Sequence, residues 1–265
     1  MKRILRFEVK RAARSKGFLI SLAMSCFIVI LDFALFNRMY AGSRAVHNAL
    51  EAWIGTDFQF AYNSLFYVLF PIIATLPFAG SYYTDLQSGY IKNICTRVSR
   101  KNYYMAKYCS TFLFAAIAVM LPLVLSLFLC MGIYPMRRPD KLLFITAGII
   151  DVNLMPEIFN LYPFVYCILF ILIDGVFAGM ISVFSICIAE RVESFFSAIA
   201  VPFAIYVLWG VLFAGNKIGN WSLMEMVNPL QRCITHGWQL LTCLLGGLAI
   251  APVWIYLKGR KKDIL

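Results

Sequence analysis

Long apolar runs alternate with shorter polar stretches along the whole of this chain. Each run is close to or above the roughly 20 residues that an α-helix needs to cross the hydrocarbon core of a bilayer. The pattern therefore predicts an all-α polytopic membrane protein, with six transmembrane helices in a single transmembrane domain over residues 1–265. The predicted spans are residues 17–36, 64–84, 108–133, 163–189, 194–214 and 236–257.

A basic stretch precedes the first span. On a helix, its basic residues form one stripe and several apolar residues fall on the opposite side. The stripe consists of Arg3, Arg6, Lys10 and Arg14, and the opposite side of Leu5, Val9 and Ala12. We expect residues 1–16 to form an amphipathic interfacial helix along the membrane lipid. A basic flank that only orients the first span stays an alternative.

The most polar connection between spans runs from residue 85 to residue 107. The span before it is interrupted by Pro71 and Pro77, which remove backbone donors and kink a membrane helix. Because Lys and Arg gather on the cytoplasmic side of membrane proteins, this basic loop is predicted to be cytoplasmic. The same rule places both termini in the cytoplasm, with seventeen of the 24 Lys and Arg residues inside and seven outside.

The predicted outer connections contain two segments of mixed polarity. Residues 142–152 are apolar but too few to cross the bilayer, so we expect a small interfacial helix there. Residues 215–235, before the last span, are predicted to form an external segment that is partly re-entrant.

Composition narrows the class of protein. The chain is 62% hydrophobic and 14% charged, far more apolar than soluble domains. Its net charge of +11 comes from residues that flank apolar runs, which favours membrane orientation over binding of nucleic acid. No catalytic motif and no set of metal-ligand spacings is found, so we expect neither an enzyme nor a metal site. Of the eight cysteines only Cys233 is predicted to lie outside, which leaves no external disulfide.

Two acidic residues lie within predicted spans, Asp32 and Asp174. A carboxylate in hydrocarbon is costly, so an intramembrane aspartate is a candidate for a substrate or ion pathway. The alternative is a neutral carboxyl that is hydrogen-bonded to a neighbouring helix. A secondary transporter that couples transport to an ion through Asp174 is one function that this leaves open.

The polar loop carries a recognisable set of residues. They are Asp85, then Gly89, Tyr90, Ile91, Lys92, Asn93 and Ile94, then Arg97, Ser99 and Arg100, and finally Tyr103, Tyr104, Ala106 and Lys107. With this set the chain resembles the permease subunits of type 2 ATP-binding-cassette exporters. The first acid is more often Glu in that family. Independently of the resemblance, the glycine permits a bend, while the isoleucines and charges suit contact with a soluble partner. A loop that only fixes topology stays an alternative.

The resemblance implies a function and a set of partners. It implies that a separate ATP-binding-cassette ATPase docks on the loop, with the N-terminal helix as a second contact. The implied coupling residues are Asp85, Gly89, Tyr90, Ile91, Lys92, Ile94, Arg97, Arg100 and Lys107. ATP and Mg²⁺ would bind the partner, so no cofactor is expected in this chain.

The implied assembly contains a second permease copy or a paralogue in a bacterial plasma membrane. The implied substrate is hydrophobic or amphipathic: a peptide, an antimicrobial compound, a drug or a lipid-like molecule. A membrane protein that gives immunity or senses a peptide without transporting it is a further alternative.

Overall fold

The structure is a computed structural model that describes residues 2–39, 41–42, 48–54, 61–78, 80–136, 154–189, 191–192, 194–213, 221–230 and 235–260. Every regular element in these ranges is a helix, in agreement with the predicted class. The helices are α1 (Lys2–Ala13), α2 (Lys16–Met39), α3 (Ala49–Ile54), α4 (Ala61–Thr75), α5 (Gly80–Gln87), α6 (Tyr90–Cys95), α7 (Arg100–Ile133), α9 (Pro156–Leu161), α10 (Pro163–Ala189), α11 (Phe195–Phe213), α12 (Leu223–Val227) and α13 (Gly237–Arg260).

The apolar helices are long enough for a membrane. Within the described ranges, 5 helices meet both the length and the hydropathy that a span requires. They cover Lys16–Met39, Leu65–Gln87, Arg100–Ile133, Pro163–Ala189 and Phe195–Phe213. α13 is also 24 residues long, and its first half, Gly237–Ala249, is apolar. The chain is therefore a multi-pass membrane protein.

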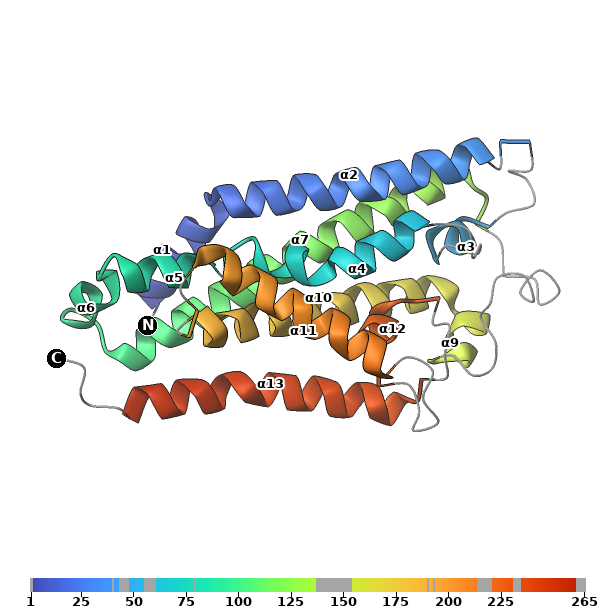
Figure 1. The fold of residues 1–265 in the computed structure, drawn as a ribbon. Coiled ribbons are helices and arrows are strands. Elements are labelled where there is room, and N and C mark those ends of the chain that lie inside the picture. The colour runs from blue at the N-terminus through green and yellow to red at the C-terminus, as the bar shows by residue number, and fades with distance from the viewer. Residues whose placement is uncertain are drawn as a thin grey trace.

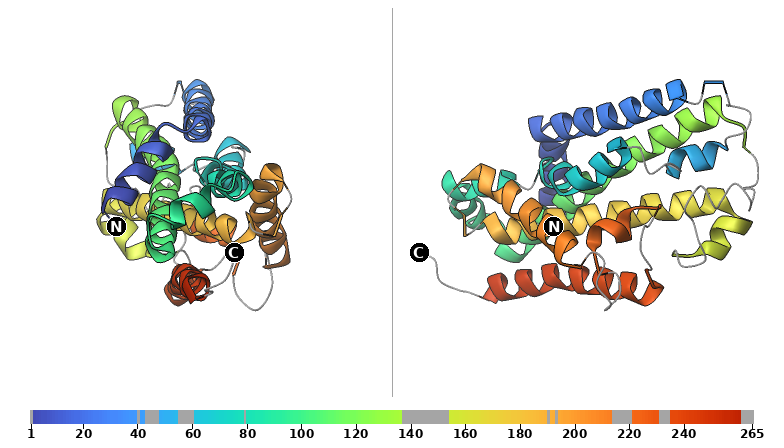
Figure 2. Two further views of the ribbon diagram at one scale, coloured as in Figure 1. Left: turned by 90° about the vertical axis from the view of Figure 1, so that its left-hand side faces the viewer. Right: turned by 45° about the vertical axis from the view of Figure 1, so that its right-hand side comes forward.

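These helices form an elongated bundle around α7 and α10 (Figure 1). α2 and α13 lie on opposite sides of it, as the view along its axis also shows (Figure 2). α7 and α10 pack closely because two glycines of α10 face α7. A Cβ atom on Gly175 would overlap with the side chain of Met120, and one on Gly179 with the ring of Phe112. The small residues thus let the two backbones approach each other.

The structure bears on two of the predicted spans. The second is interrupted near Pro77 as predicted, since α4 ends at Thr75 and α5 begins at Gly80, whereas Pro71 lies within α4. Pro77 lies in the break. Because proline has no backbone N–H, it cannot donate the hydrogen bond that would continue α4. The helix that contains the third predicted span, α7, begins at Arg100, eight residues before residue 108. α7 has 34 residues, more than the roughly 20 that cross the hydrocarbon core. Its basic first turns therefore extend into the polar region.

The short helices α3, α9 and α12 lie toward the same end of the bundle (Figure 1). α3 lies between the first two predicted spans, and its Leu50 and Ile54 are buried. Its Trp53 Nε1 donates a hydrogen bond to the backbone oxygen of Leu123 on α7, 3.1 Å away. α12 lies within the predicted external segment 215–235 and buries Met226. The helix predicted over residues 142–152 lies outside the described residues.

The opposite end of the bundle carries the polar loop. α1, α6, the start of α7 and the C-terminal end of α13 lie there together (Figure 1). We call it the basic end, since α1 and the first turn of α7 are rich in Lys and Arg and α6 carries the exposed Lys92.

Candidate functional site

The connection between the second and third spans forms a short helix at the tip of the basic end. α5 ends at Gln87, Gly89 turns the chain, and α6 follows. Gly89 has φ 69°, in the left-handed region that glycine adopts without a Cβ penalty. The amide of Lys92 then donates to the Gly89 carbonyl at 3.1 Å. The glycine in the predicted motif therefore supplies the bend that turns α6 away from α5.

The side chains of the predicted coupling residues fall into two groups. Lys92 and Arg97 are exposed, and Tyr90, Ile91, Ile94 and Arg100 are partly exposed. Asp85 and Lys107 are both 1% exposed and do not reach the surface. The first group can therefore contact a soluble partner directly, and the second can act only through its neighbours.

α1 packs against this loop with a face that includes an acid. The four basic residues of the predicted stripe, Arg3, Arg6, Lys10 and Arg14, are all exposed. The buried residues of α1 are Ile4, Glu8 and Ala12, which recur every four positions and therefore share one side of the helix. Ile4 packs in a cluster with Tyr82, Tyr103 and Ala106, and Tyr90 and Ile94 of α6 contact the same cluster.

An open groove separates α1 from the loop. It has a volume of about 690 Å³ and lies between the first two turns of α1 and α6 with the turn after it. Its lining combines the guanidinium groups of Arg3 and Arg97 with the apolar side chains of Phe7, Ile94 and Val98. The side chain of Phe7 is 52% exposed and therefore presents an apolar surface next to Arg3 and Arg97.

Beneath the groove lies a buried cluster of charges that joins α1, α5 and α7. We call it the charge cluster, and it consists of Glu8, Arg11, Asp85, Tyr103 and Lys107. Both guanidinium NH₂ groups of Arg11 donate to the carboxylate of Asp85, one of them to Oδ2 at 3.0 Å. Lys107 Nζ donates to the same Oδ2 at 2.8 Å, and Tyr103 donates to it at 2.9 Å. Lys107 also reaches Glu8 Oε2, 3.4 Å away.

The electrostatics of the charge cluster are balanced. Two carboxylates face two cations, so the cluster is neutral although Glu8 is 0% and Asp85 1% exposed. Burial alone would lower the pKa of Arg11, but the hydrogen bonds and charge of Asp85 outweigh it and the pKa is raised. Removing one partner from such a buried set leaves an uncompensated charge, which is strongly destabilising. The charge cluster therefore fixes α1 to the two helices that flank α6.

Aromatic rings extend these contacts to α6. Lys107 Nζ lies 4.2 Å from the ring centroid of Phe78, in the break between α4 and α5. The guanidinium carbon of Arg11 lies 5.3 Å from the ring centroid of Tyr90, the first residue of α6. Both distances are within the range of cation–π attraction. Arg11 thus contacts α5 and α6 at once.

Sequence reasoning named Tyr103 in the loop motif without assigning it a role, and it did not identify Glu8 and Arg11 as members of this site. Their partners lie on other helices, 74 positions away in the case of Arg11 and Asp85. One signal was present: Glu8 is the single acid before residue 32 and lies on the same side of α1 as Ile4 and Ala12. An acid on the apolar side of a basic helix indicates a buried partner.

The two intramembrane aspartates lie elsewhere. Asp174 is buried in the middle of α10, and Asp32 lines a small cavity near the end of α2 that is opposite to the basic end. They do not join the charge cluster. Among the described residues, no group of three or more His, Cys, Asp and Glu side chains could hold a metal ion.

Comparison with known proteins yields a family match. The family model described as "ABC-2 family transporter protein" matches residues 4–210, which include α1 from its third residue onward, the charge cluster and α6. No curated protein and no solved structure matches the chain.

Proposed function

The chain belongs to the ABC-2 family of transporter proteins, and we propose that it is the membrane-spanning subunit of an ATP-driven exporter. ATP and Mg²⁺ bind a separate ATP-binding-cassette ATPase in this proposal. The observation that carries it is the position of α6, which projects from the basic end while the charge cluster fastens its flanking helices to α1.

The groove beside α6 has the chemistry of a docking surface. Arg3, Arg97 and the exposed Lys92 favour a partner with acidic side chains at its edge. The apolar side chains of Phe7 and Ile94 favour one apolar side chain of the partner at its centre. We therefore propose that the ATPase contacts α6 and the exposed side of α1 together.

Through the charge cluster, a contact of the ATPase with α6 would also move the membrane spans. α5 and α7, on either side of α6, continue into the second and third spans. Because α1 is bonded to both, a displacement of α6 moves α1 and the ends of these two spans as one piece. ATP-driven closure of two ATPase subunits would then shift two permease chains between inward-facing and outward-facing arrangements.

The remaining parts of the proposal follow the sequence analysis. The second permease chain is a copy or a paralogue, and the assembly spans a bacterial plasma membrane with both termini in the cytoplasm. The substrate is a hydrophobic or amphipathic compound, such as a peptide, an antimicrobial compound, a drug or a lipid-like molecule. The strongly apolar spans, α10 and α11 among them, fit a substrate of this class.

Reversal of one exposed charge at the groove tests the proposal. We expect Arg97→Glu to weaken co-purification of the ATPase at least about tenfold, because it sets like charges against each other in the contact. The tagged protein is produced with the genes that flank its own, purified in mild detergent, and the co-eluting proteins are quantified.

Arg38→Glu is the matched control, since Arg38 is also an exposed arginine but lies at the end of α2 away from the basic end. It should retain the ATPase at the wild-type level. The proposal fails if no ATPase co-elutes with the wild-type chain, or if both variants lose it equally while eluting as folded protein.

A further inference from the structure

Asp174 has an environment that suits a neutral carboxyl group. It is 0% exposed in the middle of α10, about 16 Å along the helix from Pro163. Its Oδ2 accepts a hydrogen bond from the Tyr67 hydroxyl of α4 at 3.4 Å, and its Oδ1 has no hydrogen-bond partner within the described residues. No described Lys or Arg forms an ion pair with it. A charge there would be buried without a counter-ion, so the proton-bound form is favoured.

The helices packed around Asp174 contribute few other titratable groups. α11 contributes Tyr206, whose hydroxyl donates to the backbone oxygen of Tyr67 at 3.2 Å and not to the carboxyl. The side chains of α7 next to Gly175 are Met120 and Ala116, neither of which is titratable. Tyr67 is thus the described side chain through which Asp174 contacts its polar surroundings.

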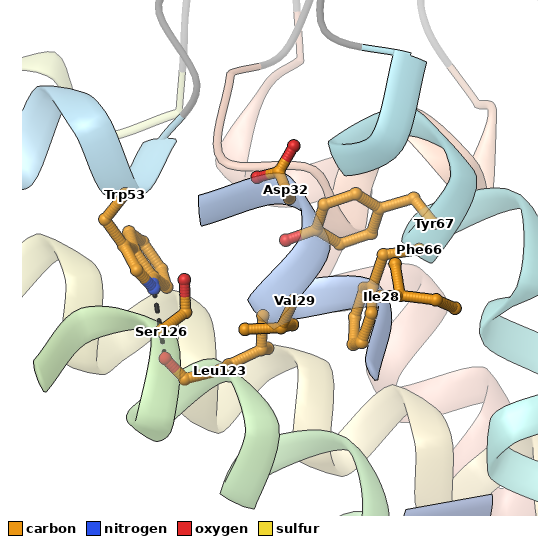
Figure 3. A pocket seen from close by; sticks show the side chains of 8 residues that line it. All are labelled: Ile28, Val29, Asp32, Trp53, Phe66, Tyr67, Leu123 and Ser126. Atoms are coloured by element: carbon orange, nitrogen blue, oxygen red, sulfur yellow. Dashed lines mark hydrogen bonds between the residues drawn. The ribbon is translucent and has the colours of Figure 1, made fainter. Parts of the chain in front are cut away.

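Tyr67 also lines a small cavity near the end of α2 (Figure 3). The cavity has a volume of about 20 Å³, which is room for one water molecule. Its polar lining comes from Asp32 of α2, Tyr67 of α4 and Ser126 of α7. A buried water needs two to four polar partners, and these three side chains can supply them. Trp53 Nε1 also faces this region but is already bonded to the Leu123 carbonyl.

Tyr67 therefore contacts both the Asp174 carboxyl and the cavity that Asp32 lines. A phenol has one proton to donate and an oxygen that can accept. The proton is directed at Asp174, which leaves the oxygen to accept a hydrogen bond from a water in the cavity. Asp32 lies about 10 Å along α2 from Met39, so the cavity is nearer than Asp174 to the end of the bundle that lies opposite the basic end.

We propose that Asp174 is a proton-binding site that exchanges its proton with the Asp32 cavity through Tyr67. When Asp174 is a carboxylate, Tyr67 gives its phenolic proton to Oδ2 and accepts a proton from the cavity water. That water accepts one in turn from the Asp32 carboxyl. Asp174 ends neutral, Asp32 ends as a carboxylate, and the tyrosine and the water are unchanged. This proposal does not depend on which partner docks at α6.

Infrared spectroscopy of the full-length protein in lipid nanodiscs tests both parts of it. The carbonyl stretch of a protonated carboxyl is separate from that of a carboxylate, and its shift after transfer to D₂O reports proton exchange. We expect a protonated-carboxyl band in the wild type that Asp174→Asn removes. Tyr67→Phe should slow the deuterium shift of this band at least about tenfold, because exchange then requires local opening of the bundle.

Two further variants separate the path from general loosening of the bundle. Tyr206→Phe removes a phenol from the same core without breaking the path and should exchange at the wild-type rate. Val29→Leu adds volume to the cavity lining, leaves Tyr67 in place, and should slow the exchange as Tyr67→Phe does. A protonated-carboxyl band that keeps its full wild-type intensity in Asp174→Asn overturns the site. Wild-type exchange rates in both Tyr67→Phe and Val29→Leu overturn the path.

Discussion

Lys107→Met will destabilise the protein by about 3–5 kcal/mol, the cost of removing one partner from a buried set of charges. Lys107 is 1% exposed, and its Nζ contacts both Asp85 and Glu8. Without it, two buried carboxylates share one arginine. Thermal unfolding in detergent, followed by tryptophan fluorescence, should show a strongly lowered midpoint.

A double variant distinguishes charge balance from loss of packing. Glu8→Gln together with Lys107→Met restores a neutral cluster and keeps the pair between Arg11 and Asp85. We expect it to be more stable than Lys107→Met alone, since effects within one network are not additive. Lys101→Met changes an exposed lysine on the first turn of the same helix and should stay within about 0.5 kcal/mol of wild type. Equal losses in Lys107→Met and in the double variant would contradict the charge cluster.

Gly17→Ala, which adds one methyl group at the corner between α1 and α2, will lower the stability of the protein. A Cβ atom on Gly17 would overlap with the backbone oxygen of Leu76, which cannot rotate away as a side chain can. The Ser15 hydroxyl also donates to the Pro77 carbonyl at 2.7 Å, so the corner is held against the break between α4 and α5. We expect a loss of about 1–3 kcal/mol, typical of overpacking, and faster hydrogen exchange in α1.

Gly132→Ala is the control for that change. Gly132 lies in the last turn of α7, and a Cβ atom added to it would meet no other atom of the described residues within 4 Å. A helical glycine with free space gains stability on change to alanine, by about 0.4–1 kcal/mol. If Gly17→Ala were as stable as Gly132→Ala, the close contact between the corner and the break would be wrong.

The hydropathy pattern was sufficient to predict the helical bundle. The span over residues 163–189 coincides with α10, because it is bounded by polar or helix-starting residues at both ends. The prolines of the second span predicted its interruption but not which of them breaks the helix: Pro71 lies within α4 and Pro77 in the break, because the effect of a proline depends on how its neighbours satisfy the backbone. Buried α3 could not be predicted, because its sequence is short and its burial comes from contacts with α7.

The candidate site was predictable in position but not in its internal contacts. The motif around Gly89 located α6, and the helical wheel identified the exposed basic stripe of α1. Asp85 and Lys107 were expected to face a partner, whereas the structure buries them in the charge cluster. Their partners Glu8 and Arg11 lie on a distant segment, and one sequence contains no information on which charges meet across helices. Spacing along a helix shows which residues share a face, but not what that face contacts.

Site-specific photo-crosslinking tests the central claim that α6 is the docking element. A photoreactive amino acid in place of Asn93 lies on the exposed side of α6 and in the groove. The same amino acid in place of Phe128, which is 66% exposed on α7 within the spans, is the control. In cells that also produce the flanking genes, we expect irradiation to yield an adduct with an ATPase at position 93 and none at position 128. An ATPase that forms an adduct at position 128 but none at position 93 would contradict the account.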